Sequence, residues 1–285
     1  MAEILIYNTE IKMLNAETKL FAILGYPVKH SCSPQMQNKW FEKESLNCIY
    51  LAFEPAPEDL EKTIESLKIL GFQGVNITIP HKIEVMKYVD FIDESAEKIG
   101  SVNTIAFKNS KLYGYNTDHL GFSQDLASKK VNLKKKNVLV IGAGGGARAI
   151  VYALVNSGAK NVYIANRTLD NAEKLANIFK IKVFDISKSG ELLPEIDLLV
   201  NTSACGMKKT DILPFEVDKV KSSLVVYDLI YNKITPFTKL AEDKGLKIFT
   251  GDGMLIRQGA CGFKIWTGKY PDIEVAEKLL KKFIR

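Results

Sequence analysis

Short apolar runs alternate with amphipathic stretches along the first half of the chain. Residues 20–24 and 48–53 have the length and composition of strands. Between Pro57 and Gly71, apolar side chains recur every three or four positions, which predicts a helix that ends at the glycine. The other elements expected here are a helix capped by Ser33 and opened by Pro34, a strand within residues 72–79, a helix carrying Val85, Val89 and Ile92, and a hairpin of residues 102–107 and 111–115.

A second series of elements begins after residue 136. Residues 137–141 form a continuous apolar run, typical of a strand buried on both faces of a parallel sheet, and an amphipathic stretch follows to about residue 158. The remaining elements expected are strands at 162–165, 181–184, 198–201 and 225–229, a helix at 172–178 and two helices between 254 and 285. Repeated strand–helix–strand units predict an α/β fold with mostly parallel sheets.

Length and composition bound the class of protein. The 285 residues fit two compact domains, and 46% hydrophobic with 25% charged residues is typical of a globular protein. No apolar run approaches the roughly 18 residues of a membrane span. The first apolar run is short and interrupted by Glu3 and Asn8, so we expect no secretory signal, and we expect residues 1–20 to form an extra strand or an arm.

Cysteine spacing and charge exclude further classes. The four cysteines, Cys32, Cys48, Cys205 and Cys261, have no metal-site spacing, so we expect free thiols in the cytoplasm and no metal. The net charge is +6, but the only dense basic run is Lys134–Lys136, which a solvated loop explains better than nucleic-acid binding. Only four of the 39 basic residues are arginines, at 148, 167, 257 and 285. Since lysine supplies most of the positive charge, a position that has arginine is a candidate for a specific role.

A glycine-rich sequence lies between the strand at 137–141 and the following helix. Gly142, Gly144 and Ala147 form the pattern G-x-G-x-x-A. The first glycine permits a tight turn, the second lets the backbone approach a pyrophosphate, and the alanine permits close helix packing. Because the helix N-terminus offers free N–H groups to phosphates, we predict a dinucleotide site here.

The end of the next strand indicates which dinucleotide binds. An NAD site places an acidic residue there for the ribose 2′-hydroxyl, whereas this chain has Asn166, Arg167 and Thr168. A guanidinium suits a 2′-phosphate, so NADP is favoured. An arginine that only packs on the adenine is the alternative.

Six separated motifs occur in a fixed order over nearly the whole chain, from about Phe21 to the C-terminus. They are GYPVKHSCSPQMQN (25–38), NITIPHK (76–82), SVNTI (101–105), YNTDHLGF (115–122), NRT (166–168) and GDGMLIRQGACGF (251–263). Together they closely resemble the shikimate dehydrogenase family. The resemblance implies reduction of 3-dehydroshikimate to shikimate with NADPH, in chorismate and aromatic amino-acid biosynthesis.

The resemblance also implies an architecture and a set of site residues. An N-terminal substrate domain (1–118) and a Rossmann-like NADP-binding domain (119–251) would flank a cleft, and C-terminal helices (252–285) would pack back on the first domain. Implied substrate contacts are Ser31 and Ser33 to a carboxylate, Thr78, Asn103, Asp118 and Gln258 to ring hydroxyls, and Tyr231, with Lys82 as the catalytic lysine. Implied cofactor contacts are Gly142, Ala143, Gly144, Gly145 and Gly146 to phosphates, Asn166, Arg167, Thr168 and Asn171 to adenosine, and Leu229, Gly251 and Met254 near the nicotinamide.

Reduction of a ketone needs a hydride and a proton for the developing alkoxide. On the resemblance, Lys82 supplies the proton, and the Asp118 carboxylate favours the charged, proton-donating form of the lysine. The chain departs from the family pattern at His119, where glycine is frequent, and at Asn171, where a second arginine is frequent.

Several alternatives stay open. Ser31 and Ser33 could be helix caps, Asn103 a hairpin residue, and Gln258 a solvated helix residue. The chain could be a dual quinate/shikimate dehydrogenase, although Ser33 and Arg167 argue against that. A non-catalytic NADP sensor would keep the glycine loop without needing Lys82 and Asp118. Both a monomer and a homodimer are compatible with the lysine-rich surface.

Overall fold

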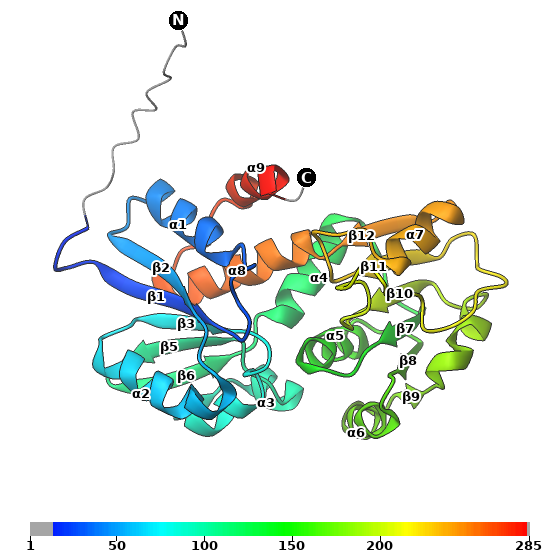
Figure 1. Cartoon of the computed structure of the whole chain (residues 1–285), viewed down its shortest axis with the longest axis horizontal. Coiled ribbons are helices and arrows are strands. Elements are labelled where there is room, and N and C mark those ends of the chain that lie inside the picture. Colours follow the sequence, from blue (N-terminus) through cyan, green and yellow to red (C-terminus); the bar gives the residue numbers. More distant parts are fainter. Residues whose placement is uncertain (1–13, 284–285) are drawn as a thin grey trace, which may run out of the picture.

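The computed structural model describes residues 14–283 and contains two six-stranded sheets joined by helices (Figure 1). The expected arm at the N-terminus lies mostly outside these residues. The strands of the first sheet are β1 (Lys19–Leu24), β2 (Cys48–Phe53), β3 (Gly74–Ile77), β4 (Phe91–Ile92), β5 (Thr104–Lys108) and β6 (Lys111–Tyr115). Their order is β2-β1-β3-β5-β6-β4. Strands β1, β2 and β3 run parallel, and the β5–β6 hairpin adds antiparallel strands, so this sheet is mixed.

Alternating side chains of β1 show how this sheet is covered. Ala22 and Leu24 pack toward α2 (Leu60–Ile69), whereas Phe21 and Ile23 pack toward α1 (Ser33–Lys43), α8 (Asp252–Thr267) and α9 (Ile273–Phe283). Successive side chains of a strand point to opposite faces of the sheet, so β1 contributes to two cores, one on each face. The second core uses residues from the two ends of the chain, as Figure 1 shows in blue, orange and red.

The prediction of a helix carrying Val85, Val89 and Ile92 is wrong. The chain instead forms a 3₁₀ turn at Glu84–Tyr88, then β4, and then α3 (Glu94–Ile99), whose N-terminus is capped by Asp93. The Asp90 carboxylate accepts a hydrogen bond from the Leu112 N–H at 2.9 Å and holds this segment against β6. Tertiary pairing thus prevails over a short apolar periodicity.

Ser33 is not the cap of the first helix, contrary to our expectation. Cys32 is the N-cap residue, it makes no side-chain capping bond, and Ser33 is the first residue of α1. The Ser33 N–H donates to Oγ of Ser31 at 3.2 Å.

The second sheet is entirely parallel, with the order β12-β11-β10-β7-β8-β9. Its strands are β7 (Asn137–Ile141), β8 (Asn161–Ala165), β9 (Lys182–Val183), β10 (Leu198–Asn201), β11 (Val225–Asp228) and β12 (Lys247–Thr250). This is the order of dinucleotide-binding sheets, with β7 as the first strand. One face is covered by α5 (Gly145–Asn156) and α6 (Leu169–Phe179), and the other by α7 (Pro236–Asp243). The predicted α/β fold is confirmed.

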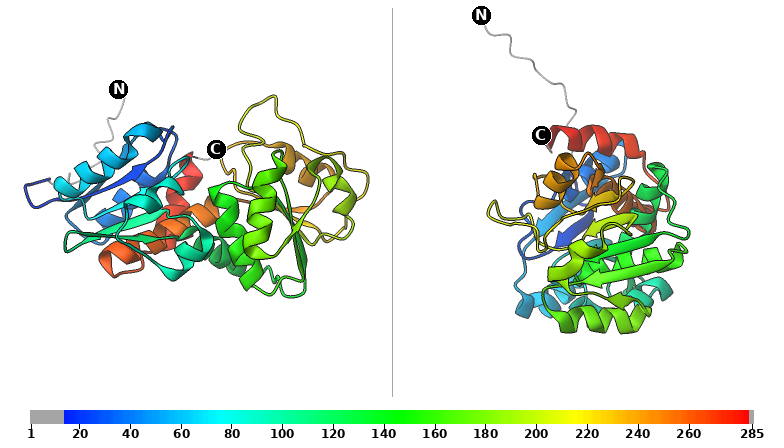
Figure 2. Two further views of the ribbon diagram at one scale, coloured as in Figure 1. Left: turned by 90° about the horizontal axis from the view of Figure 1, so that it is seen from below. Right: turned by 90° about the vertical axis from the view of Figure 1, so that its right-hand side faces the viewer.

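Two helices connect the sheets. Helix α4 (Asp118–Ser128) lies beside α8 in the middle of the molecule, as two views show (Figures 1 and 2). A Cβ atom on Gly121 would lie only 2.7 Å from the backbone nitrogen of Gln258, so only glycine permits this approach. At the far end of α8, the Trp266 indole donates to the Ile105 carbonyl of the first sheet at 3.0 Å. Among the described residues, no helix is both long and apolar enough to cross a membrane.

Candidate active site

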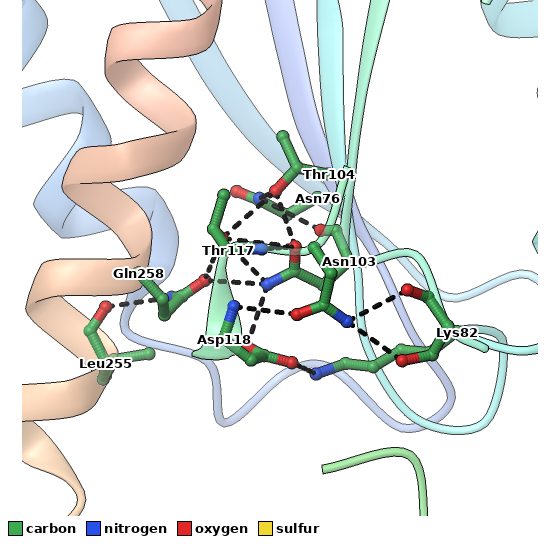
Figure 3. A network of polar contacts seen from close by, with 10 residues as sticks. Asn76, Lys82, Asn103, Thr104, Thr117, Asp118, Leu255 and Gln258 are labelled. Carbon is green, nitrogen blue, oxygen red and sulfur yellow. Dashed lines mark hydrogen bonds and ion pairs between the residues drawn. The ribbon is translucent and has the colours of Figure 1, made fainter. Parts of the chain in front are cut away.

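Lys82 and Asp118 form an ion pair where the first sheet meets α4 (Figure 3). Lys82 lies in the turn after β3, Asp118 is the first residue of α4, and Nζ lies 2.6 Å from Oδ2. The side chains are only 14% and 6% exposed. The turn is fixed because the Lys82 carbonyl accepts the Val102 N–H at 2.8 Å. Low exposure strengthens the attraction between the two charges relative to a surface pair.

Asn103 joins this pair to α8. Its Nδ2 donates to Oδ1 of Asp118 at 2.8 Å and to Oγ1 of Thr117 at 2.9 Å. The same Nδ2 donates a longer hydrogen bond to Oε1 of Gln258, at 3.3 Å. Its Oδ1 accepts the Thr117 N–H at 2.8 Å, so the orientation of the amide is fixed. The structure therefore brings four predicted site residues into one network, shown in Figure 3. They are Lys82, Asn103, Asp118 and Gln258.

A second layer of buried polar groups holds Asn103 in place. Asn76 donates to Oγ1 of Thr104 at 3.0 Å and to the Asn103 carbonyl at 3.2 Å, and it accepts the Tyr50 hydroxyl at 2.6 Å. Sequence reasoning assigned no role to Asn76 or Thr117. An asparagine inside the apolar strand GVNI was the available signal, because a buried amide needs partners.

The predicted carboxylate contacts lie close together in the chain after β1, Ser31 in the loop and Ser33 at the start of α1. Ser31 and Ser33 follow β1, and Thr78 follows β3, so all three lie at the carboxyl ends of adjacent parallel strands. Glu54 holds the loop after β1, since its Oε1 accepts the N–H groups of Val28 at 2.5 Å and Lys29 at 3.1 Å. These bonds lower the pKa of Glu54. Among the described residues, no direct hydrogen bond joins the two serines to the Asn103 network.

The glycine loop has the geometry that a dinucleotide requires. Gly142 has a φ of +107°, Gly144 is the exposed N-cap of α5, and Ala147 is fully buried. A Cβ atom on Gly142 would lie 2.7 Å from Oγ1 of Thr202, so a side chain would collide there. The N–H groups at the start of α5 suit a pyrophosphate, so the loop fits that part of a dinucleotide such as NADP.

This loop lies directly beside the catalytic candidate. A Cβ atom on Gly145 would lie 3.6 Å from Cβ and 3.7 Å from Cδ of Lys82. On its other side, a Cβ on Gly146 would lie 3.8 Å from Cδ2 of Leu229. Leu229 in turn contacts Gly251, where a Cβ would lie 2.2 Å from the Leu229 carbonyl oxygen. The predicted phosphate and nicotinamide contacts are thus contiguous with the ion pair.

The predicted adenosine contacts lie one strand away. Asn166, Arg167 and Thr168 follow β8, which pairs with β7, and Arg167 and Asn171 are exposed. Asn166 Nδ2 donates to the Thr168 carbonyl at 2.8 Å, which shapes the turn. The arginine is therefore accessible to a ligand beside the glycine loop.

Tyr231 lies on the loop after β11 and reaches Cys32, the N-cap residue of α1. Its hydroxyl forms a hydrogen bond with the Cys32 thiol, and burial raises the pKa of both groups. The loop is held by Asp228, which accepts Asn201 Nδ2 at 2.9 Å, the Ile230 N–H at 3.0 Å and the Thr235 hydroxyl at 2.5 Å. Burial raises the pKa of Asp228. Sequence reasoning gave Asp228 no role.

Comparison with protein families agrees with this arrangement. The family model of the shikimate dehydrogenase substrate-binding domain matches residues 23–105, and that of shikimate/quinate 5-dehydrogenase matches residues 125–229. The model of the shikimate 5′-dehydrogenase C-terminal domain matches residues 248–281. The chain belongs to the shikimate dehydrogenase family.

Individual shikimate dehydrogenases are similar over their whole length. The NADP⁺-dependent shikimate dehydrogenase of Aquifex aeolicus is 44% identical over 94% of this chain and 98% of its own. A crystal structure of the shikimate dehydrogenase from Aquifex aeolicus superposes with a TM-score of 0.89, covering 93% of this chain and 98% of that one. The Thermus thermophilus enzyme, in complex with NADP(H) and shikimate, has 34% identity and a TM-score of 0.82, covering 93% and 99%.

Proposed function

We propose that this protein catalyses the reversible NADPH-dependent reduction of 3-dehydroshikimate to shikimate, a step in chorismate and aromatic amino-acid biosynthesis. The observation that carries the proposal is the Lys82–Asp118 pair, 2.6 Å apart and in contact with the glycine loop at Gly145. A proton donor and a dinucleotide cradle are the two parts that a ketone reductase must bring together. The NADP⁺-dependent relatives support the choice of cofactor.

Lys82 moves the proton in this proposal. When bound, NADPH supplies the hydride that reduces the ring carbonyl. The Lys82 ammonium has three N–H donors, of which Asp118 holds one. The others have no partner among the described residues, so they can donate to the carbonyl oxygen and pass a proton to it as negative charge develops. In the oxidation direction, neutral Lys82 accepts the hydroxyl proton.

The other predicted residues bind and orient the substrate. Ser31 and Ser33 hold the carboxylate, and Thr78, Asn103, Asp118, Gln258 and Tyr231 contact the remainder of the ring. Asn103 is already fixed by Thr117 and Asp118, so binding does not need to order it. Short hydroxyl and amide side chains match the several hydroxyl groups of the substrate.

The cofactor contacts complete the proposal. Residues 142–146 bind the phosphates, residues 166–168 with Asn171 bind the adenosine, and Leu229, Gly251 and Met254 border the nicotinamide. We keep the division into segments 1–118, 119–251 and 252–285. We also propose a cytoplasmic location, as the sequence leads us to expect.

A steady-state assay of shikimate and quinate against NADP⁺ and NAD⁺ tests the proposal. We expect shikimate with NADP⁺ to give the highest kcat/KM. A comparable value for quinate would instead identify a dual quinate/shikimate dehydrogenase. Binding of NADPH, followed by fluorescence, without turnover of either substrate would favour the sensor.

A further inference from the structure

A fully buried carboxylate lies between the two sheets, away from the substrate network. Asp125, in α4, is 1% exposed. It accepts hydrogen bonds from Lys129 Nζ at 2.5 Å, from Arg257 of α8 at 3.1 Å and from the Tyr227 hydroxyl of β11 at 2.7 Å. Three separate elements therefore meet at one side chain.

Helix α8 packs closely against Asp125 at Gly253. A Cβ atom on Gly253 would lie 2.0 Å from Oδ1 of Asp125, so α8 approaches the carboxylate closely only because residue 253 is glycine. Burial, together with the negative charge of Asp125, raises the pKa of Tyr227, which therefore stays protonated and donates. A carboxylate buried this deeply requires such partners, because an unpaired buried charge is strongly unfavourable.

Each element that meets at Asp125 also carries part of the candidate active site. Helix α4 begins at Asp118. Asp118 and Asp125 are seven residues apart, so they lie on the same face of the helix. Arg257 directly precedes Gln258 in α8. Tyr227 lies two residues before Leu229, which contacts the glycine loop.

We propose that Asp125 is a positioning residue that fixes the substrate-binding elements α4 and α8 relative to β11 and the nicotinamide side of the site. This inference rests on the proposed function for its kinetic consequence. Asp125 lies behind the site and acts through Tyr227 and Arg257.

The expected consequence is a loss of turnover without a loss of binding. Hydride transfer needs the reacting atoms about 3–3.5 Å apart, and a misplacement of about 1 Å can lower the rate about 100-fold. The proposed substrate contacts Asp118 and Gln258 are carried by α4 and α8, whereas the proposed cofactor contact Leu229 directly follows β11. Weakening the link between β11 and α4 therefore misaligns two bound ligands while each keeps its own contacts.

Tyr227→Phe is the principal test, because it removes one hydroxyl and leaves Asp125 paired with Arg257 and Lys129. Tyr270→Phe is the matched control, since its hydroxyl also donates to α4, at Gln124 (2.8 Å), but from the loop after α8 and not from the second sheet. Asp125→Asn is a second, stronger variant if it folds.

We expect Tyr227→Phe to lower kcat for shikimate oxidation about tenfold, with KM values and the NADP⁺ dissociation constant within about twofold of wild type. The primary isotope effect with shikimate deuterated at the oxidised carbon should rise, because hydride transfer becomes slower than the other steps. Tyr270→Phe should match wild type in both measurements. An unchanged kcat and isotope effect in folded Tyr227→Phe would overturn the inference, as would an equal loss in Tyr270→Phe. Failure of the wild type to oxidise shikimate would instead refute the proposed function.

Discussion

Lys82 and Asp118 are 36 residues apart in sequence, yet Nζ of the lysine lies 2.6 Å from Oδ2 of the aspartate. The fold brings them together because the turn after β3 is bonded to the segment before the β5–β6 hairpin, and α4 begins directly after that hairpin. A pair held by backbone contacts on both sides is preorganised for proton transfer.

The first prediction concerns Lys82. Replacing Lys82 by alanine should lower kcat about 100- to 10,000-fold, the usual contribution of a general acid–base group, with a smaller change in the KM for shikimate. Steady-state kinetics in the oxidation direction provide the measurement, with the exposed Lys68→Ala as control. Near-normal turnover at saturating shikimate would show that another group moves the proton.

Asp118 has two separable roles in the proposed mechanism. Asp118→Asn keeps an acceptor for Asn103 but removes the charge that orients the ammonium of Lys82, so kcat should fall while the KM for shikimate changes little. Asp118→Ala should also raise that KM about tenfold or more, because a substrate hydroxyl loses its partner. Equal KM values for the two variants would contradict a direct substrate contact.

Arg167 should determine the preference between cofactors. Its exposed side chain follows β8, and no acid precedes it at the end of that strand. Arg167→Ala should raise the KM for NADP⁺ about tenfold, as expected for one lost charged contact, and leave the KM for NAD⁺ unchanged. Since Asn171 is uncharged and gives the 2′-phosphate no second cationic partner, we expect measurable NAD⁺ use by the wild type. Equal effects of the substitution on both cofactors would refute the 2′-phosphate contact.

The Cys32 thiol should react slowly at neutral pH. Burial raises its pKa, although its hydrogen bond with Tyr231 opposes this shift, so little of the reactive thiolate is present near pH 7. Alkylation should accelerate about tenfold per pH unit toward alkaline pH, inactivate the enzyme, and be slowed by shikimate with NADP⁺. Mass mapping identifies the modified residue, and Cys32→Ser should remain active and resist inactivation. If Cys32→Ser is inactivated equally fast, another thiol such as Cys205 is responsible.

His119 should make the fold sensitive to acid. Its ring packs edge-on against Tyr152 at 5.2 Å, its buried Nδ1 has no hydrogen-bond partner among the described residues, and burial lowers the pKa of the ring. The unfolded chain therefore binds a proton at His119 more tightly than the folded chain does. The stability that neutral His119 contributes is fully present above about pH 6.5 and is lost as the pH falls toward the folded-state pKa. The melting temperature of His119→Phe should therefore fall less than that of wild type between about pH 7.5 and 5.5, by a few degrees. Parallel pH dependences would contradict this account.

Local patterns predicted much of the fold. The bounds of β2, β6 and β10 agree with the sequence expectation, because each is an apolar or alternating run closed by turn residues. Helix α7 and strand β12 were missed, although Thr235 followed by Pro236 is a helix-start signal, and the structure shows a capping box there. The Asp125 cluster had no local signal, since its partners Tyr227 and Arg257 are 102 and 132 residues away. The motifs named the candidate site residues, whereas only the coordinates placed the glycine loop beside Lys82.

The core that contains Phe21, Trp40 and Phe41 also contains Phe263 and Leu280, near the opposite end of the chain. A ribosome therefore has to synthesise the chain through about residue 280 before the core on this face of the first sheet can be completed. All six strands of the parallel sheet are translated after those of the first sheet, yet that sheet has all its strands once β12 has been synthesised, before α8 and α9. Until α8 and α9 have been synthesised, the aromatic face of β1 and α1 stays uncovered, and an apolar face exposed in this way favours association between nascent chains.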